Sequence, residues 1–109
     1  MNAEEYAQWM AGQMSEETLQ AKVEDLAQRL GWRKYHTHDS RRSDKGFPDL
    51  VLVHAGRGRV LYRELKKQTG RVTKEQKEWL ADLTAAGQDA GLWRPVHWFD
   101  RTIEKELLA

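Results

Sequence analysis

The chain has 109 residues, no cysteine, and nearly balanced charge, with 18 Lys and Arg against 17 Asp and Glu. This length accommodates one domain with one core, and the lack of cysteine excludes disulfides and zinc-thiolate sites, so any metal must bind oxygen or imidazole. No apolar stretch approaches the length of a membrane span and residues 1–14 lack the features of a signal peptide, so we expect a soluble, cytoplasmic protein.

Helical spacing dominates the start of the chain. Residues 1–14 form either a short helix or a loose arm ahead of a main domain over residues 15–109. From Ser15 apolar residues recur every three or four positions until Gly31, which predicts a helix with a serine cap and a glycine end. The next expected elements are a strand over 32–37, a polar basic loop over 38–46 and a strand over 49–54.

The second half of the chain continues with strands and helices in short blocks. Thr73 opens a helix that ends before Gly87, and Pro95 closes the last strand. The expected elements are a turn over 55–59, a strand over 60–67, a connector over 70–72, a helix over 73–86, a strand over 90–94 and a terminal helix over 100–108 capped by Asp100. This order predicts a small α/β domain.

The predicted hairpin brings acidic residues together. In a tight antiparallel pair the numbers of facing residues sum to a constant, so a turn centred between Gly56 and Arg57 places Asp49 opposite Glu64. Facing Cβ atoms are roughly 4.5–5.5 Å apart, and Lys66 lies on the same face. Taken singly, Asp49 could be an ordinary turn aspartate, and Glu64 with Lys66 could be an ordinary surface ion pair. Together they predict a site that holds a divalent cation against a phosphate.

The expected reaction is in-line hydrolysis of a phosphodiester. Asp49, Glu64 and a backbone carbonyl near Leu65 would bind one or two Mg²⁺ or Mn²⁺ ions that polarise the phosphate. Lys66 would orient the attacking water or stabilise the charge that forms in the transition state.

The motif Gly46-Phe47-Pro48-Asp49-Leu50, followed by Glu64-Leu65-Lys66, Gly70 and Thr73-Lys74-Glu75-Gln76, resembles the VRR-NUC family of the PD-(D/E)xK nuclease superfamily. The resemblance spans about Ser15 to Pro95. It implies a restriction-endonuclease-like αβββαβ core with a central mixed sheet flanked by helices. It also implies a divalent-metal site and cleavage of branched or structured DNA in replication, recombination or repair. Smaller family members, often virus-encoded, are stand-alone domains, which suggests a bacterial or phage-infected cell and a possible homodimer.

By this resemblance Asp49 and Glu64 are metal ligands and Lys66 is the catalytic lysine. Gln76 matches the family's glutamine on the second helix, but Thr73-x-x-Gln76 is also a capping box, and both roles could coexist.

The family also has an acidic residue ahead of Leu-Gln in the first helix, for which Glu16 and Glu17 are candidates. At about 100° per residue, Glu16 lies within roughly 50° of the apolar stripe and Glu17 about 150° away, so Glu16 is chosen. The plain alternative is that both acids favour the positive end of the helix.

The basic residues gather in the middle of the chain. Residues 32–77 hold 13 Lys and Arg against 5 Asp and Glu, a net charge of +8, while the flanks hold 5 against 12, a net charge of −7. This segregation predicts attraction to DNA, with a solvated basic surface as the plain alternative. The predicted phosphate contacts are Arg41, Arg42 and Lys45 in the loop, and Lys67, Arg71, Lys74 and Lys77 near the start of the second helix.

Two other functions compete with a structure-selective nuclease: a non-cleaving DNA-binding or assembly module, and a site-specific restriction-like enzyme. So short a chain leaves little material for reading bases, which favours structure selectivity. Near the C-terminus Trp93, Val96, Trp98 and Phe99 either form an apolar dimer surface or cover the core from below.

Overall fold

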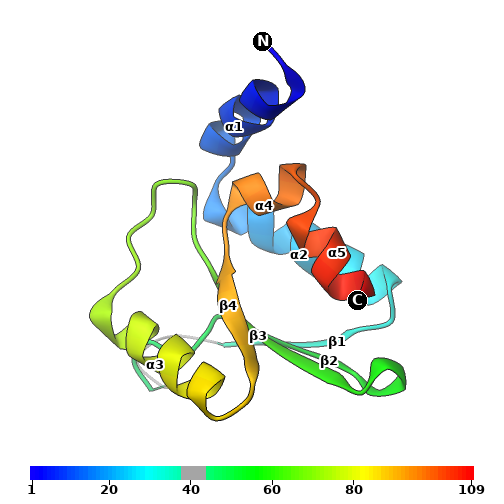
Figure 1. Ribbon diagram of the computed structural model, residues 1–109, viewed down its shortest axis with the longest axis vertical. Helices are drawn as coiled ribbons and strands as arrows, with labels where there is room; N and C mark the ends of the chain where they lie inside the picture. Colours follow the sequence, from blue (N-terminus) through cyan, green and yellow to red (C-terminus); the bar gives the residue numbers. More distant parts are fainter. Residues whose placement is uncertain (38–43) are drawn as a thin grey trace.

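The computed structural model of the chain describes residues 1–37 and 44–109. Helices surround a single four-stranded sheet, which confirms the predicted α/β fold class (Figure 1). The elements are α1 (Ala3–Gln13), α2 (Glu16–Arg29), β1 (Arg33–His36), β2 (Leu50–His54), the short 3₁₀ turn η1 (Ala55–Arg57), β3 (Arg59–Leu65), α3 (Lys74–Ala85), β4 (Asp89–Trp93), α4 (Pro95–Phe99) and α5 (Thr102–Leu108).

The sheet is mixed, with the strand order β1-β2-β3-β4. β1 and β3 run antiparallel to β2, and β4 runs parallel to β3. The parallel pair needs a crossover, which α3 provides between β3 and β4. Figure 1 shows α2, α4 and α5 together on one side of the sheet, while α3 lies on the other side next to β4.

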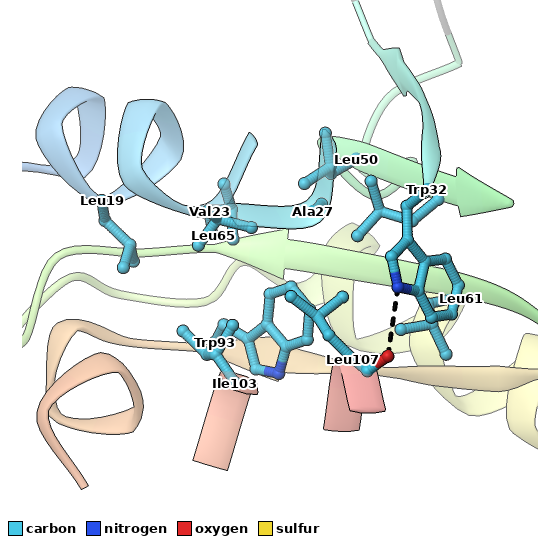
Figure 2. Packing of buried hydrophobic residues seen from close by; sticks show 11 residues of the cluster. Leu19, Val23, Ala27, Trp32, Leu50, Leu61, Leu65, Trp93, Ile103 and Leu107 are labelled. Carbon is cyan, nitrogen blue, oxygen red and sulfur yellow. Dashed lines mark hydrogen bonds between the residues drawn. The ribbon is translucent and has the colours of Figure 1, made fainter. Parts of the chain in front are cut away.

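The core lies between the sheet and α2 with α5. Alternation along β2 and β3 directs leucines to this face, where they meet the apolar stripe of α2 (Figure 2). The indole Nε1 of Trp32 donates to the backbone oxygen of Leu107 at 3.1 Å and so ties the start of β1 to α5. The buried cluster consists of Leu19, Val23, Ala27, Trp32, Leu50, Leu52, Leu61, Leu65, Trp93, Ile103 and Leu107.

The predicted caps explain where the helices begin and end. Ser15 accepts a hydrogen bond from the backbone of Thr18 at 3.1 Å, and Gly31 follows α2 with a φ of +90°. Thr73 and Gln76 form the predicted capping box of α3. The residues before Ser15 are helical, since Asn2 caps α1. No helix within the described ranges combines the length and apolar character needed to cross a membrane.

The C-terminal region departs from the prediction. Pro95 not only follows the last strand but also begins the short helix α4. The first position of a helix suits proline. The last helix begins at Thr102 rather than Asp100, although Asp100 accepts a hydrogen bond from the Thr102 backbone at 2.9 Å. The third strand ends at Leu65 rather than at residue 67.

The aromatic residues of this region cover the core within one chain. Trp93 is fully buried, Trp98 packs against the core, and Val96 and Phe99 are half-buried in α4, which lies against α1. Of the two alternatives that the sequence left open, the described structure favours cover of the core, and a homodimer stays a prediction.

A buried arginine occupies the core face of β3. Arg63 is 4% exposed and donates to Asp89 and to Glu106, both at 2.8 Å, while its guanidinium lies 5.0 Å from the ring centre of Trp93. Burial alone would raise the pKa of Asp89, but hydrogen bonds from Arg63 and Arg59 outweigh it and hold this pKa below its ordinary value. The charge of Arg63 is thus compensated, and it joins β3 to β4 and α5.

Candidate active site

The β2–β3 hairpin has the register that the sequence predicts. Leu50 pairs with Arg63, so one residue earlier Asp49 stands opposite Glu64. The backbone N–H of Asp49 donates to Glu64 Oε1 at 3.2 Å, and the backbone N–H of Leu65 donates to Asp49 Oδ2 at 2.9 Å. The two carboxylates are therefore held side by side by backbone groups of the opposite strands.

The end of β1 fixes the backbone on both sides of Asp49. The backbone N–H of Thr37 donates to the Asp49 carbonyl at 2.8 Å, and the Thr37 hydroxyl donates to the Pro48 carbonyl at 2.7 Å. Thr37 was not predicted as part of the site. Its role depends on the pairing of β1 with β2, and the sequence motif begins only at Gly46.

The loop ahead of Asp49 is docked onto α3. Gly46 has a φ of +88°, and a Cβ built on it would lie 2.5 Å from the Glu75 carbonyl carbon. Phe47 then packs edge-on against Trp79 with ring centres 5.0 Å apart. Glycine is thus needed here both for its backbone conformation and for close approach to a helix.

Glu64 is the most buried charged group of the site, with 1% of its surface exposed. Its Oε2 accepts a hydrogen bond from the Gln76 side chain at 2.7 Å and lies 3.8 Å from the Lys66 ammonium. Burial, followed by the charge of Asp49, raises the pKa of Glu64 to about 8, and Lys66 only partly opposes this. Two adjacent carboxylates in a buried site are costly unless a cation neutralises them.

Gln76 makes both of the contacts that the sequence left open. Its side-chain oxygen accepts from the Thr73 backbone at 2.8 Å, which completes the capping box, while its nitrogen donates to Glu64. The start of α3 is therefore connected directly to the carboxylate pair.

Glu16 approaches the same cluster from the start of α2. It is half-buried while Glu17 is exposed, as the helical-wheel argument predicts. Burial and the charge of Asp49 raise the pKa of Glu16, and Lys66 lowers it. Glu16 is therefore within electrostatic range of Asp49 and Lys66.

Several of the predicted DNA-contacting cations lie at or near the start of α3, the helix whose Gln76 contacts Glu64. Lys45 is exposed and pairs with Glu75 at 3.6 Å. Arg71, Lys74 and Lys77 line one open surface hollow at the start of α3. Lys67 is exposed on the connector after β3. Arg41 and Arg42 lie outside the described residues.

The donor set fits Mg²⁺ or Mn²⁺ with few protein ligands. Among the described residues no group of three or more acidic or histidine side chains is arranged to hold an ion. Asp49 and Glu64 supply two adjacent carboxylates, and Mg²⁺ commonly binds through one or two carboxylates while retaining water and substrate phosphate oxygens. Two mutually repelling carboxylates, one buried and one half-buried, are therefore suited to such an ion.

The fold is thus a mixed sheet flanked by helices, with Asp49, Glu64 and Lys66 at the open end of the β2–β3 hairpin. The model of the VRR-NUC domain family matches residues 3–96, and the chain belongs to this family.

A solved structure described as a VRR_NUC domain is similar to this chain with a TM-score of 0.61. The match covers 84% of this chain and 97% of that one at 22% identity, so it supports the fold alone. Comparison with curated proteins gave no significant match.

Proposed function

We propose that this chain is a Mg²⁺- or Mn²⁺-dependent endonuclease that hydrolyses phosphodiester bonds in branched or junction DNA during replication, recombination or repair. The observation that carries the proposal is the buried Glu64 carboxylate held next to the half-buried Asp49, with Lys66 on the same face. Two adjacent carboxylates of which one is buried cost free energy in an ordinary fold, whereas a bound divalent cation would offset their negative charge.

Each member of the cluster has a chemical task in this proposal. Asp49 and Glu64 would hold the ion, together with the backbone carbonyl of Leu65, and the chemistry that the ion would supply is polarisation of the scissile phosphate. Lys66 orients the attacking water or stabilises the developing charge. Gln76 fixes the orientation of the Glu64 carboxylate through its hydrogen bond.

Glu16 lies at the edge of the cluster and we assign it to the water or to the ion. Its neighbour Glu17 is exposed and offers a matched control. Glu16→Ala should lower the rate of cleavage, whereas Glu17→Ala should leave it near normal. Equal effects of both substitutions would mean that Glu16 acts only through the positive end of the helix and has no part in the site.

The predicted basic residues would contact the phosphate backbone of the substrate. Arg41, Arg42 and Lys45 precede the Asp49 strand, while Lys67, Arg71, Lys74 and Lys77 surround the start of α3. All are suited to the phosphate backbone rather than to base edges, which favours recognition of DNA shape over sequence. A homodimer would supply the two cuts that a symmetric junction needs, and it remains a prediction.

A substrate panel tests this function. Duplex, flap, four-way junction and single-stranded DNA are incubated with Mg²⁺, Mn²⁺ or EDTA, using the wild type and Asp49→Ala, Glu64→Ala and Lys66→Ala. We expect metal-dependent cleavage of the branched substrates by the wild type only, with DNA binding retained in the variants.

Other outcomes of the panel identify the competing functions. Binding without cleavage under any metal would identify a non-cleaving module. Cleavage of one duplex sequence in preference to branches would identify a restriction-like enzyme. A site variant that cleaves at a near-normal rate would refute the assigned residues.

A further inference from the structure

The face of the sheet that carries Asp49 and Glu64 continues away from them as an open surface. The strand registers place Tyr35 opposite Val51 and Val51 opposite Tyr62, one row from the two acids. The row beyond contains Arg33 opposite Val53. Because side chains alternate along a strand, these residues share the face of the acids and point away from the core.

No described helix covers the β1–β2 half of this face. α3 packs against β4, and Figure 1 shows it beside that end of the sheet, away from β1 and β2. The side chains reflect this: Tyr35 is 58% exposed and Val53 is 38% exposed, although both belong to regular strands. With more than half of its surface exposed, Tyr35 is accessible to a ligand.

Tyr35 differs from the neighbouring aromatic residue. Tyr62 is half-buried and packs edge-on against Phe47, with ring centres 6.4 Å apart, so its ring is already engaged. Tyr35 makes no ring contact within the described ranges. It therefore presents a free π-face one row from the carboxylate pair.

The charges around Tyr35 favour an anionic ligand. Arg33 is exposed two residues earlier on the same face. Within the described strands β1 to β3 the only acidic residue is Glu64, which belongs to the site. The aromatic pair Tyr6 and Trp9 on α1 contrasts with this, because residues 1–14 contain acids and no Lys or Arg.

We propose that Tyr35 is a stacking platform for an unpaired nucleobase next to the scissile phosphate. Tyr35 pairs with Val51, so Asp49, two residues earlier, is its diagonal neighbour on the same face. Diagonal neighbours on paired strands have Cβ atoms about 7–8 Å apart. Nucleotides advance about 3.4 Å each along a helical strand, so this separation spans about two nucleotides. A base inside a duplex has both faces covered, whereas an unpaired base at a branch can stack on an aromatic ring.

This inference rests on the proposed nuclease function, and it would account for selection of branched over continuous duplex DNA. Arg33 would contact the phosphate backbone of the same unpaired strand. The fold thus gives one sheet face two adjacent tasks: chemistry at the acids, and selection of a single-stranded segment at Tyr35.

The test measures binding without cleavage. A forked DNA with a fluorescent base analogue at the first unpaired position is compared in EDTA with a blunt duplex of the same length. We expect the wild type to prefer the fork and to quench the analogue by stacking. Tyr35→Ala should weaken fork binding about 10-fold while changing blunt-duplex binding by less than about twofold, and Tyr35→Phe should behave as the wild type.

Tyr6→Ala is the matched control, because Tyr6 is 53% exposed and lies on the acidic helix α1. It should leave both affinities and the quenching unchanged, and thermal unfolding should verify that each variant is folded. An equal loss of affinity for fork and blunt duplex, no loss at all, or failure of Tyr35→Phe would overturn the stacking assignment.

The two proposals can fail separately. Quenching that depends on Tyr35, in a protein that cleaves nothing with any metal, would overturn the nuclease function and leave the platform. Metal-dependent cleavage with unchanged fork preference in Tyr35→Ala would overturn the platform and leave the nuclease.

Discussion

Replacing Gly46 with alanine should destabilise the chain by about 2–5 kcal/mol. The positive φ of +88° costs a residue with a Cβ about 1–2 kcal/mol. The new Cβ would also lie 2.5 Å from the carbonyl carbon and 2.7 Å from the Cβ of Glu75, and such overpacking typically costs about 1–3 kcal/mol. The nearest atoms belong mainly to the helix backbone, which cannot move aside without displacing the start of α3.

Substitutions of two other glycines separate the cost of the positive φ from the cost of overpacking against Glu75. Gly58 has a φ of +63° with no atom within 4 Å of a built Cβ, so Gly58→Ala should cost only about 1–2 kcal/mol. Gly12 lies in α1 with equally open surroundings, so Gly12→Ala should stabilise by about 0.5–1 kcal/mol.

Urea unfolding followed by tryptophan fluorescence would measure all three free energies of unfolding. The Gly46→Ala change should also lower the unfolding midpoint by at least about 8 °C. Its cleavage rate should fall as well, because the loop that contains Gly46 positions Asp49. A cost of Gly46→Ala within about 0.5 kcal/mol of that of Gly58→Ala would refute the close-approach reasoning.

Four further predictions concern the candidate site and the ion pairs of Arg63. In EDTA the stability of the wild type should fall as pH rises from about 4.5 to 8, because burial raises the pKa of Glu64 to about 8 and the folded chain retains its proton; urea titrations should show this slope lost in Glu64→Gln. Thr73→Ala should cost about 1 kcal/mol in unfolding experiments with little effect on cleavage, whereas Gln76→Ala should also slow cleavage, because only Gln76 donates to Glu64. Arg63→Ala should cost about 2–4 kcal/mol, since it removes the buried guanidinium that pairs with Glu106 and, together with Arg59, with Asp89. The stability that Asp89 contributes should be present above pH 3.8 and be lost as pH falls through its lowered pKa, and Asp89→Asn should remove this dependence in acid titration.

The hairpin was predictable because its geometry is local. Strand alternation and a short turn fix which residues face one another, so the opposition of Asp49 and Glu64 followed from their numbers alone. The helix caps at Ser15 and Thr73 were predictable for the same reason, since a cap involves residues only three positions apart.

The parts that were missed depend on contacts between distant segments. Arg63 interrupts a run of core leucines, and its partners Asp89 and Glu106 come 26 and 43 residues later. Pro95 was read as a terminator, yet proline is compatible with the first turn of a helix, and packing of α4 on α1 decides the outcome. Burial of the C-terminal aromatics also depends on α1, so sequence pattern alone could not distinguish core from interface.

The most direct test of the shared-cation site is nicking of supercoiled plasmid by purified wild type and Glu64→Gln. This substitution keeps the size of the side chain and removes the charge that would hold the ion. We predict nicking by the wild type with Mg²⁺ or Mn²⁺, none in EDTA, and none by the folded variant with either metal. Nicking by Glu64→Gln at the wild-type rate, or nicking that persists in EDTA, would contradict the account.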